Sequence, residues 1–230
     1  MLSPWLALML AFAYVLVAIG LGELLRRSLH ASKEFTRKFI HIAVGMISVP
    51  TVLWFSDLRW AVIPPLAFVV INYLDYRFGI VQAMMSSNRS NLGTVYFPLA
   101  FAAILVLFWG DPSAPTMHGL LIVAALMPMT WGDAFAAILG KRFGAHRFAV
   151  FNRTRSVEGS LAMFAFSFTA TFLALAALSV AQPLAASLAL AFAAALVATI
   201  VEAFSPWGID NLTVPLVSAV VLVVLKEFAK

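Results

Sequence analysis

Cysteine is absent from this chain, and charged side chains are scarce. Among 230 residues there is no cysteine, and Asp, Glu, Lys and Arg together make up only 11%. Without cysteine there is no disulfide, no thiolate nucleophile and no Cys-ligated metal site. A soluble domain carries roughly 25% charged residues, so this low charge, beside 63% hydrophobic residues, excludes a water-soluble globular domain. A single integral membrane domain covering residues 1–230 is the prediction.

Familiar nucleotide-binding and nucleophile motifs are also missing. The chain has no GxxxxGK[ST] phosphate loop, no protein-kinase loop set and no GxSxG elbow. Any nucleotide must therefore bind to a site built from helix ends and short loops.

Long apolar runs are what the chain has in abundance. A membrane-spanning helix needs about 20 mostly apolar residues, and the runs predict an all-α polytopic bundle of about eight spans. The first run has no Lys or Arg before it and no clear cleavage site, so we expect a retained helix rather than a signal peptide. The predicted spans are 4–22, 39–55, 60–75, 93–109, 118–139, 160–180, 184–204 and 212–227.

Basic residues are distributed unevenly between the predicted connections. Twelve of the fifteen Lys and Arg residues fall in segments 23–38, 76–92 and 140–159. The positive-inside rule places these three segments in the cytoplasm and both termini outside. We therefore expect a protein of the cell (inner) membrane whose functional site faces the cytoplasm.

Asp133 stands inside an otherwise apolar segment, TWGDAFAAILGKRFG. An ionised residue within a span is costly unless a cation, a hydrogen-bond network or a metal compensates it. Gly132 and Gly140 in the same segment favour a close approach of neighbouring backbone. A structural ion pair with a loop arginine is the alternative, but a hard oxygen ligand beside phosphates favours Mg²⁺.

Three further carboxylates fall on the same predicted face. Glu158 precedes the sixth span, and Glu202 and Asp210 flank the turn before the last span. A solvated loop or turn would explain each one separately. The positive-inside rule does not explain carboxylates on this face, so we expect all four to converge.

The second and third predicted spans carry polar residues at their cytoplasmic ends. Arg37 and His41 are four residues apart and share a helix face with Lys38 nearby. Two cations and a histidine suit a phosphate-rich ligand, although Lys38 alone is better explained as an anchor to anionic head groups. Asn72 and Asp75 end the third span. Two interpretations are equally supported: the two residues have a functional role, or the end of the helix simply reaches water.

The segment NRTRSVEGS, residues 152–160, precedes the sixth apolar run. Its serines should cap the following helix, whose N-terminus favours an anion, and its arginines can bind phosphate with two hydrogen bonds. An ordinary capped basic loop is the alternative. The predicted phosphate-binding residues are Arg37, Lys38, Lys141, Arg153, Arg155, Ser156, Gly159, Ser160 and Asn211.

Five segments, taken in order, resemble the polyprenol kinase family, which includes dolichol, phytol and farnesol kinases and a CTP-dependent diacylglycerol kinase. The resemblance covers about residues 34–220, and the chain length is similar to that of the small phytol kinase-like members. Two segments are also similar to phosphatidate cytidylyltransferases, but the Pro-Lys-Lys-Thr run of those enzymes is missing here. The segments are RKFIHIAVG, GTVYFPLAF, GDAFAAILGKRFG, NRTRSVEGSLAMF and VEAFSPWGIDNLTVPL.

The resemblance implies transfer of the γ-phosphate of a nucleoside triphosphate, CTP or alternatively ATP, to a lipid alcohol. The expected partners are that alcohol, the nucleotide and membrane lipids, without nucleic acid; a homodimer is left open. Asp133, Glu202 and Asp210 are the predicted Mg²⁺ ligands. The base for the alcohol hydroxyl is left open among Glu158, Asp210 and His41, which with Asp133 form the predicted catalytic set.

Two other functions remain as alternatives. A cytidylyltransferase that joins CMP to a lipid phosphate would have much the same site. A transporter places its binding residues near the midplane, often with repeat symmetry, whereas the polar residues here gather at one face and no internal repeat is evident.

Overall fold

The structure is a computed structural model that describes residues 2–80, 92–110, 115–151, 153–178 and 183–228; Arg89, in the second basic segment, lies outside these ranges. Within them the chain is helical, as predicted, apart from one hairpin. The first half forms α1 (Pro4–Ser28), α2 (Lys33–Gly45), α3 (Ser48–Trp54), α4 (Leu58–Ala61), α5 (Ile63–Phe78) and α6 (Gly93–Phe108). The second half forms α7 (Pro115–Met127), the π-helical turn η1 (Pro128–Gly132), α8 (Asp133–Phe143), β1 (Arg147–Val150), β2 (Arg153–Ser156), α9 (Val157–Leu178), α10 (Leu184–Phe204) and α11 (Asp210–Phe228).

Among the described residues, five helices are long and apolar enough to cross a membrane. They are Pro4–Ser28, Leu58–Phe78, Gly119–Phe143, Val157–Ala177 and Leu184–Phe204, and the apolar helix α6 is shorter. The predicted run 39–55 is divided between α2 and α3 at Met46. Pro50 accounts for this break, because a proline ring clashes with the carbonyl four residues earlier and offers no N–H. The count of eight spans remains a prediction.

The hairpin β1–β2 departs from the all-α prediction, which treated residues 140–159 as a loop. Its two strands pair antiparallel, with Arg147 opposite Ser156 and Val150 opposite Arg153. Ser156 then caps α9, because its Oγ accepts a hydrogen bond of 3.1 Å from the Gly159 N–H. The predicted serine cap is confirmed, with a strand rather than a loop in front of it.

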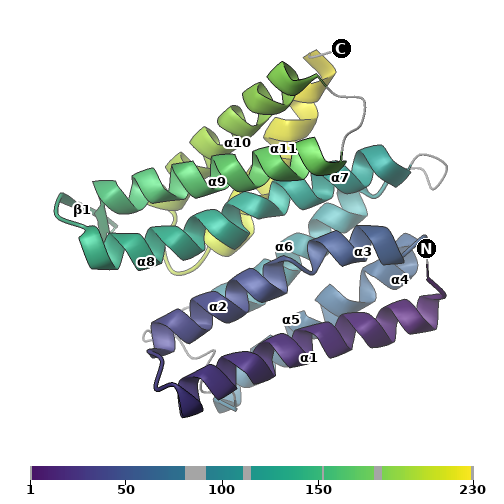
Figure 1. Cartoon of the computed structure of the whole chain (residues 1–230), viewed down its shortest axis with the longest axis horizontal. Helices are drawn as coiled ribbons and strands as arrows, with labels where there is room; N and C mark the ends of the chain where they lie inside the picture. Colours follow the sequence, from purple (N-terminus) through teal and green to yellow (C-terminus); the bar gives the residue numbers. More distant parts are fainter. Residues whose placement is uncertain (1, 81–91, 111–114, 152, 179–182, 229–230) are drawn as a thin grey trace.

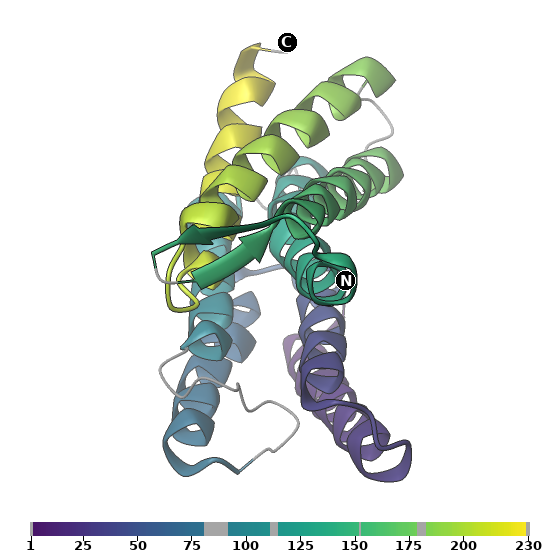
Figure 2. The ribbon, with the colours of Figure 1, turned by 90° about the vertical axis from the view of Figure 1, so that its left-hand side faces the viewer.

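The helices pack in a continuous order around a buried apolar core. The helix α9 packs against α8, η1, α7 and α10; α11 packs against α10, α7 and α6; α6 packs against α5; and α1 packs against α2. Seen from the hairpin end, α1–α2 and α5–α6 form two separate arms (Figure 2).

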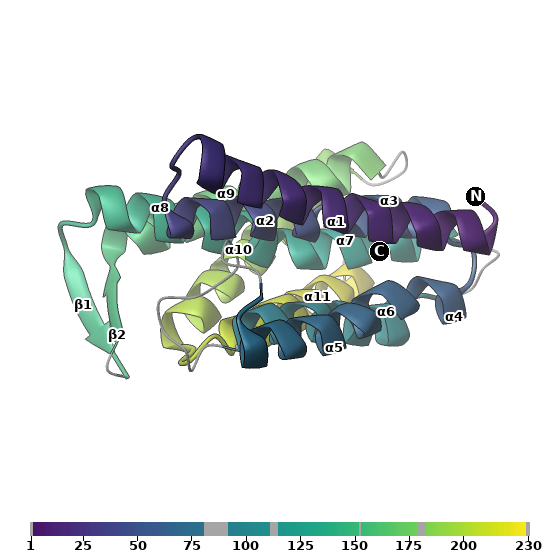
Figure 3. The same ribbon diagram turned by 90° about the horizontal axis from the view of Figure 1, so that it is seen from below.

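One end of the bundle collects the basic segments. The hairpin, the end of α1, the start of α2 and the end of α8 lie at this end, whereas α1 begins and α11 ends at the opposite end (Figures 1 and 3). The predicted phosphate-binding residues of the hairpin and of the start of α2 lie toward this end.

Candidate active site

Asp133 is held at the junction of η1 and α8. A Cβ on the preceding Gly132 would come within 2.7 Å of the Met163 Sδ and overlap Ser167 on α9, so only glycine lets this turn lie so close to α9. Pro128 begins the π-turn, and π-turns inside helices are frequent at functional sites. The result is a carboxylate with only 8% of its surface exposed.

Two more carboxylates reach Asp133 from the turn between α10 and α11. Glu202 lies in the last turn of α10, and Asp210 is the first residue of α11. The chain reverses between them through Trp207 and Gly208, both with positive φ. Ligand oxygens of Asp133, Glu202 and Asp210 all lie within 4.8 Å of one another, and all three side chains are buried. The three residues predicted as metal ligands are therefore close together.

Two cations compensate this carboxylate cluster, defined as Asp133, Glu202 and Asp210. Lys38 of α2 forms a buried ion pair with Asp133. Arg155 of β2 binds the Glu202 carboxylate and lies 3.7 Å from Asp210. Three carboxylates against two cations leave one negative charge in excess, so the cluster can still accept a cation.

The expectation that Lys38, taken alone, anchors lipid head groups is wrong. The residue is only 3% exposed because α2 packs against η1 and α8. The alternative interpretation of Asp133 was an ion pair with a loop arginine, but the cation paired with it is this helical lysine.

His41, one turn beyond Lys38, stands beside the carboxylate cluster. Its Nε2 lies 2.8 Å from the Met129 carbonyl oxygen and 3.6 Å from the Asp133 Oδ2. A carbonyl oxygen can only accept a hydrogen bond, so Nε2 carries the proton and a neutral ring keeps Nδ1 as an acceptor. The π-turn supplies this carbonyl, and thereby fixes the tautomer of His41.

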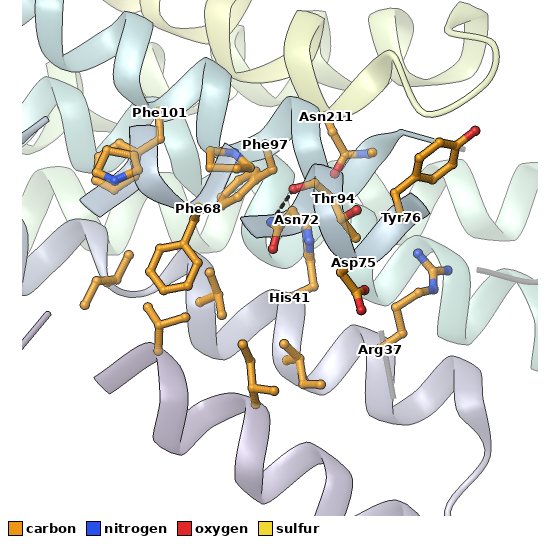
Figure 4. Close-up of a pocket in the computed structure, with 18 of the residues that line it drawn as sticks. Arg37, His41, Phe68, Asn72, Asp75, Tyr76, Thr94, Phe97, Phe101 and Asn211 are labelled. Atoms are coloured by element: carbon orange, nitrogen blue, oxygen red, sulfur yellow. Dashed lines mark hydrogen bonds between the residues drawn. The ribbon is translucent and has the colours of Figure 1, made fainter. Parts of the chain in front are cut away.

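A cavity of about 370 Å³ adjoins the cluster (Figure 4). It runs between α1, α2, α5 and α6 and includes Asn211 of α11. Arg37, His41, Asn72 and Asp75 line one end of it. The cavity joins the carboxylate cluster through His41 and through Asn211, whose Nδ2 donates a 2.9 Å hydrogen bond to the Asp210 Oδ1.

Asn72 and Asp75 are thus cavity residues. The Asn72 amide also fixes α5 against α6, because it donates a 2.7 Å hydrogen bond to the Thr94 carbonyl oxygen. Between the two interpretations of this pair, lining a functional cavity is the one that the geometry favours.

Glu158 is a predicted site residue that the structure does not bring to the carboxylate cluster. Its carboxylate accepts hydrogen bonds from the backbone N–H of His146, at 3.2 Å, and lies 2.7 Å from the His146 Nδ1. It therefore fastens the hairpin to the start of α9. The prediction that four carboxylates converge is therefore wrong for Glu158, because its contacts with His146 hold it away from the carboxylate cluster.

The remaining predicted phosphate ligands surround the basic end of the bundle. Lys141 forms an exposed ion pair with Glu34, and Arg153 begins β2. Ser156 is buried in its capping role, and Ser160 lies in the first turn of α9. These residues lie around the predicted cytoplasmic opening of the site. None of them forms a described hydrogen bond with the carboxylate cluster.

Gly140 and Gly159 set the distance between α8 and α9. A Cβ on Gly140 would come within 3.1 Å of the Gly159 Cα and 3.2 Å of the Ser156 Oγ. The predicted close approach at Gly140 is confirmed, because α8 and α9 meet here at backbone distance.

Valine at position 140 is expected to destabilise the protein. Its branched side chain would force α8 away from the backbone of α9, at a cost of about 1–3 kcal/mol for overpacking. Thermal unfolding in detergent micelles measures the effect. Gly20→Val is the matched control, because a Cβ at Gly20 meets nothing within 4 Å; equal melting temperatures for the two variants would contradict the prediction.

The apolar lining of the cavity was missed by sequence analysis. Phe68, Phe97 and Phe101 line it, but a chain with 20 phenylalanines offers no pattern that separates these three from lipid-facing or core residues. The only local signal was the motif GTVYFPLAF, which carries two of them.

The chain has apolar helices that are long enough to span a bilayer. It also has a buried acidic cluster with paired cations, and a partly apolar cavity next to that cluster. These features are those of a membrane enzyme. The chain is 35% identical to the phytol kinase of Synechocystis over 96% of its own length and 91% of that protein. It is 29% identical to a probable chloroplastic phytol kinase of Triticum aestivum, covering 95% and 75% of the two chains. A chloroplastic farnesol kinase of Arabidopsis thaliana is 27% identical over 66% of this chain and 50% of its own.

The chain belongs to the phytol and polyprenol kinase family, a family of lipid alcohol kinases, as its five motifs indicated. No family model matches it, and no solved structure matches it.

Proposed function

We propose that this protein transfers the γ-phosphate of a nucleoside triphosphate, CTP in the first instance, to an isoprenoid alcohol at the cytoplasmic face of the cell membrane. The observation that carries the proposal is the position of Asp133, Glu202 and Asp210, which are buried together beside a cavity lined by His41 and Asn211. The relatives named as phytol and farnesol kinases support the choice of an isoprenoid alcohol.

The carboxylate cluster fits Mg²⁺ in its donor set. The three side chains offer only oxygen ligands, which Mg²⁺ prefers, and Mg²⁺ is commonly held by a few carboxylates together with substrate phosphates. Asp133, Glu202 and Asp210 would hold the ion, and a bound Mg²⁺ supplies charge neutralisation on the β- and γ-phosphates.

Lys38 and Arg155 are suited to exchange partners when the nucleotide binds. Both now neutralise carboxylates, Lys38 at Asp133 and Arg155 at Glu202 and Asp210. Phosphoryl transfer depends on fixed positive charge around the transferred group, and arginine binds phosphate with two hydrogen bonds. In this mechanism each cation moves from a carboxylate to a phosphate oxygen, while Arg37, Lys141 and Arg153 add positive charge at the mouth.

His41 is the group best placed to accept the proton of the alcohol. Among the three candidate bases, Glu158 is bound to His146, and Asp210 lies within the carboxylate cluster. His41 lines the cavity and lies 3.6 Å from Asp133. With Nε2 bonded to the Met129 carbonyl, its Nδ1 takes the hydroxyl proton as the oxygen attacks phosphorus.

The proposed topology keeps eight spans, with both termini outside. It is supported by the basic segments at the ends of α1, α8 and the hairpin, which lie together at one end of the bundle (Figure 1). In this orientation nucleotide reaches the carboxylate cluster from the cytoplasm, and the alcohol arrives through the bilayer.

Incubation of the purified protein in detergent with CTP labelled separately at the α- and γ-phosphates tests the proposal. We expect label from the γ position to enter the lipid and CDP to be released, with ATP run in parallel as the alternative donor. Label from the α position with release of pyrophosphate would identify a cytidylyltransferase instead. Formation of a lipid phosphate without any membrane gradient also excludes a pure transporter.

A further inference from the structure

The lining of the cavity changes in character from one end to the other. Arg37 and Asp75 lie at one end, and Phe68 and Phe101 lie toward the other (Figure 4). Val15, Thr51 and Pro64 also line the cavity, and each lies on its element at least two helical turns away from the Arg37 and Asp75 end. A site with one polar end and one apolar end suits an amphiphile that has a single small polar group.

The cavity is long for its volume. Along α5 it is lined from Pro64 to Arg77, and at 1.5 Å per helical residue this stretch is about 20 Å long. The part beyond the polar end, from Asn72 to Pro64, is about 12 Å long, which is close to the depth of one leaflet of the hydrocarbon core, about 15 Å. This elongated cavity, called the slot below, has a volume of about 370 Å³, which is within the range of small-molecule sites in proteins.

The polar end of the slot is the end that meets the reacting groups. His41 lines the slot and contacts the Met129 carbonyl next to Asp133. Asn211 lines it too and is hydrogen-bonded to Asp210. A hydroxyl at this end would lie beside the carboxylate cluster while the attached chain extends along α5.

Resting on the proposed kinase function, we propose that this cavity binds one isoprenoid chain, with the hydroxyl at His41 and Asn211. The apolar end around Val15, Thr51 and Phe101 sets the longest chain that fits. The proposed occupant is thus a single-chain isoprenoid alcohol.

Photolabelling of the unmodified protein tests the placement of the chain. Two geranylgeraniol analogues are used, one with a diazirine at the far end of the chain and one with it beside the hydroxyl. We expect the first to label peptides containing Val15, Thr51 or Phe101, and the second to label those containing His41 or Asn72. Reversed labelling, or labelling confined to bilayer-facing residues such as Leu16, would overturn the assignment.

Substitution at the apolar end tests the length limit. Val15 is 3% exposed and lines the cavity, whereas the adjacent Leu16 is 63% exposed on the outside of the same helix. Val15→Phe should lower kcat/KM for geranylgeraniol about tenfold to a hundredfold, the range expected when a pocket no longer admits part of a substrate. The loss should be several times smaller for the shorter alcohol geraniol, and Leu16→Phe should leave both activities unchanged.

A second variant distinguishes a change in cavity length from a general folding defect. Phe101→Ala lengthens the slot and should raise activity on longer polyprenols relative to geranylgeraniol. An equal change for all chain lengths in both variants would overturn the length limit. If the wild-type protein phosphorylates no alcohol from CTP or ATP, the proposed function fails, whereas the photolabelling separately decides whether the chain occupies the cavity.

Discussion

Asparagine at position 133 is expected to lower the rate of phosphoryl transfer about a hundredfold to a thousandfold, the usual cost of removing one preorganised electrostatic group from an active site. Asp133 lies between Lys38 and His41 and shares the carboxylate cluster with Glu202 and Asp210. The amide keeps the size of the side chain but removes its charge, so cation binding and the local field are lost together. Transfer of γ-label from CTP to the alcohol measures the effect.

The matched control is Asp57→Asn. Asp57 caps α4 and pairs with Arg59 at an exposed position outside the cavity lining and the carboxylate cluster. This variant should retain activity, and both proteins should elute as single species on size-exclusion chromatography in detergent. Full activity of Asp133→Asn would contradict the role of Asp133 in metal binding.

The second large effect is expected on stability, at Lys38. Replacement of Lys38 by Met leaves the Asp133 carboxylate buried without its cation, and breaking a buried pair in this way costs about 3–5 kcal/mol. The same change combined with Asp133→Asn removes both charges and should recover most of the loss. Thermal unfolding of Lys38→Met, Asp133→Asn and the double variant in detergent measures the loss of stability and its recovery. A chelator is present in each experiment to exclude metal.

Lys141→Met serves as the control for this prediction. Lys141 also forms an ion pair, with Glu34, but its side chain is 71% exposed. Exposed pairs contribute little to stability because water solvates both partners, so its melting temperature should hardly change. If Lys38→Met is as stable as Lys141→Met, the Lys38–Asp133 pair does not hold α2 against η1.

Much of the candidate site followed from the order of apolar runs and charges in the sequence. Asp133, Glu202 and Asp210 each lie near the same end of a predicted span, so the alternation of spans put them on one face. Their approach to within 4.8 Å then required the π-turn at Pro128 and the reversal at Trp207 and Gly208.

Glu158 is the carboxylate whose position the sequence did not predict. The sequence placed Glu158 on the same face as the other three carboxylates, but its position across that face depends on packing. The hairpin β1–β2 forms through backbone pairing of Arg147–Val150 with Arg153–Ser156, and Glu158 is held against His146. Charge patterning carries no information on such pairing.

The sequence by itself determined a helical membrane protein, the face that carries its ionisable residues, and its family. These properties depend on hydropathy, charge and motif order, which are all local along the chain. Only the tertiary structure decided that Lys38 is buried against Asp133, that His41 donates to the Met129 carbonyl, and that His41 lines a cavity between the helices. The physical reason is that burial, ion pairing and cavity shape depend on which helix faces meet, and in a chain apolar on nearly every face the sequence does not single out those contacts.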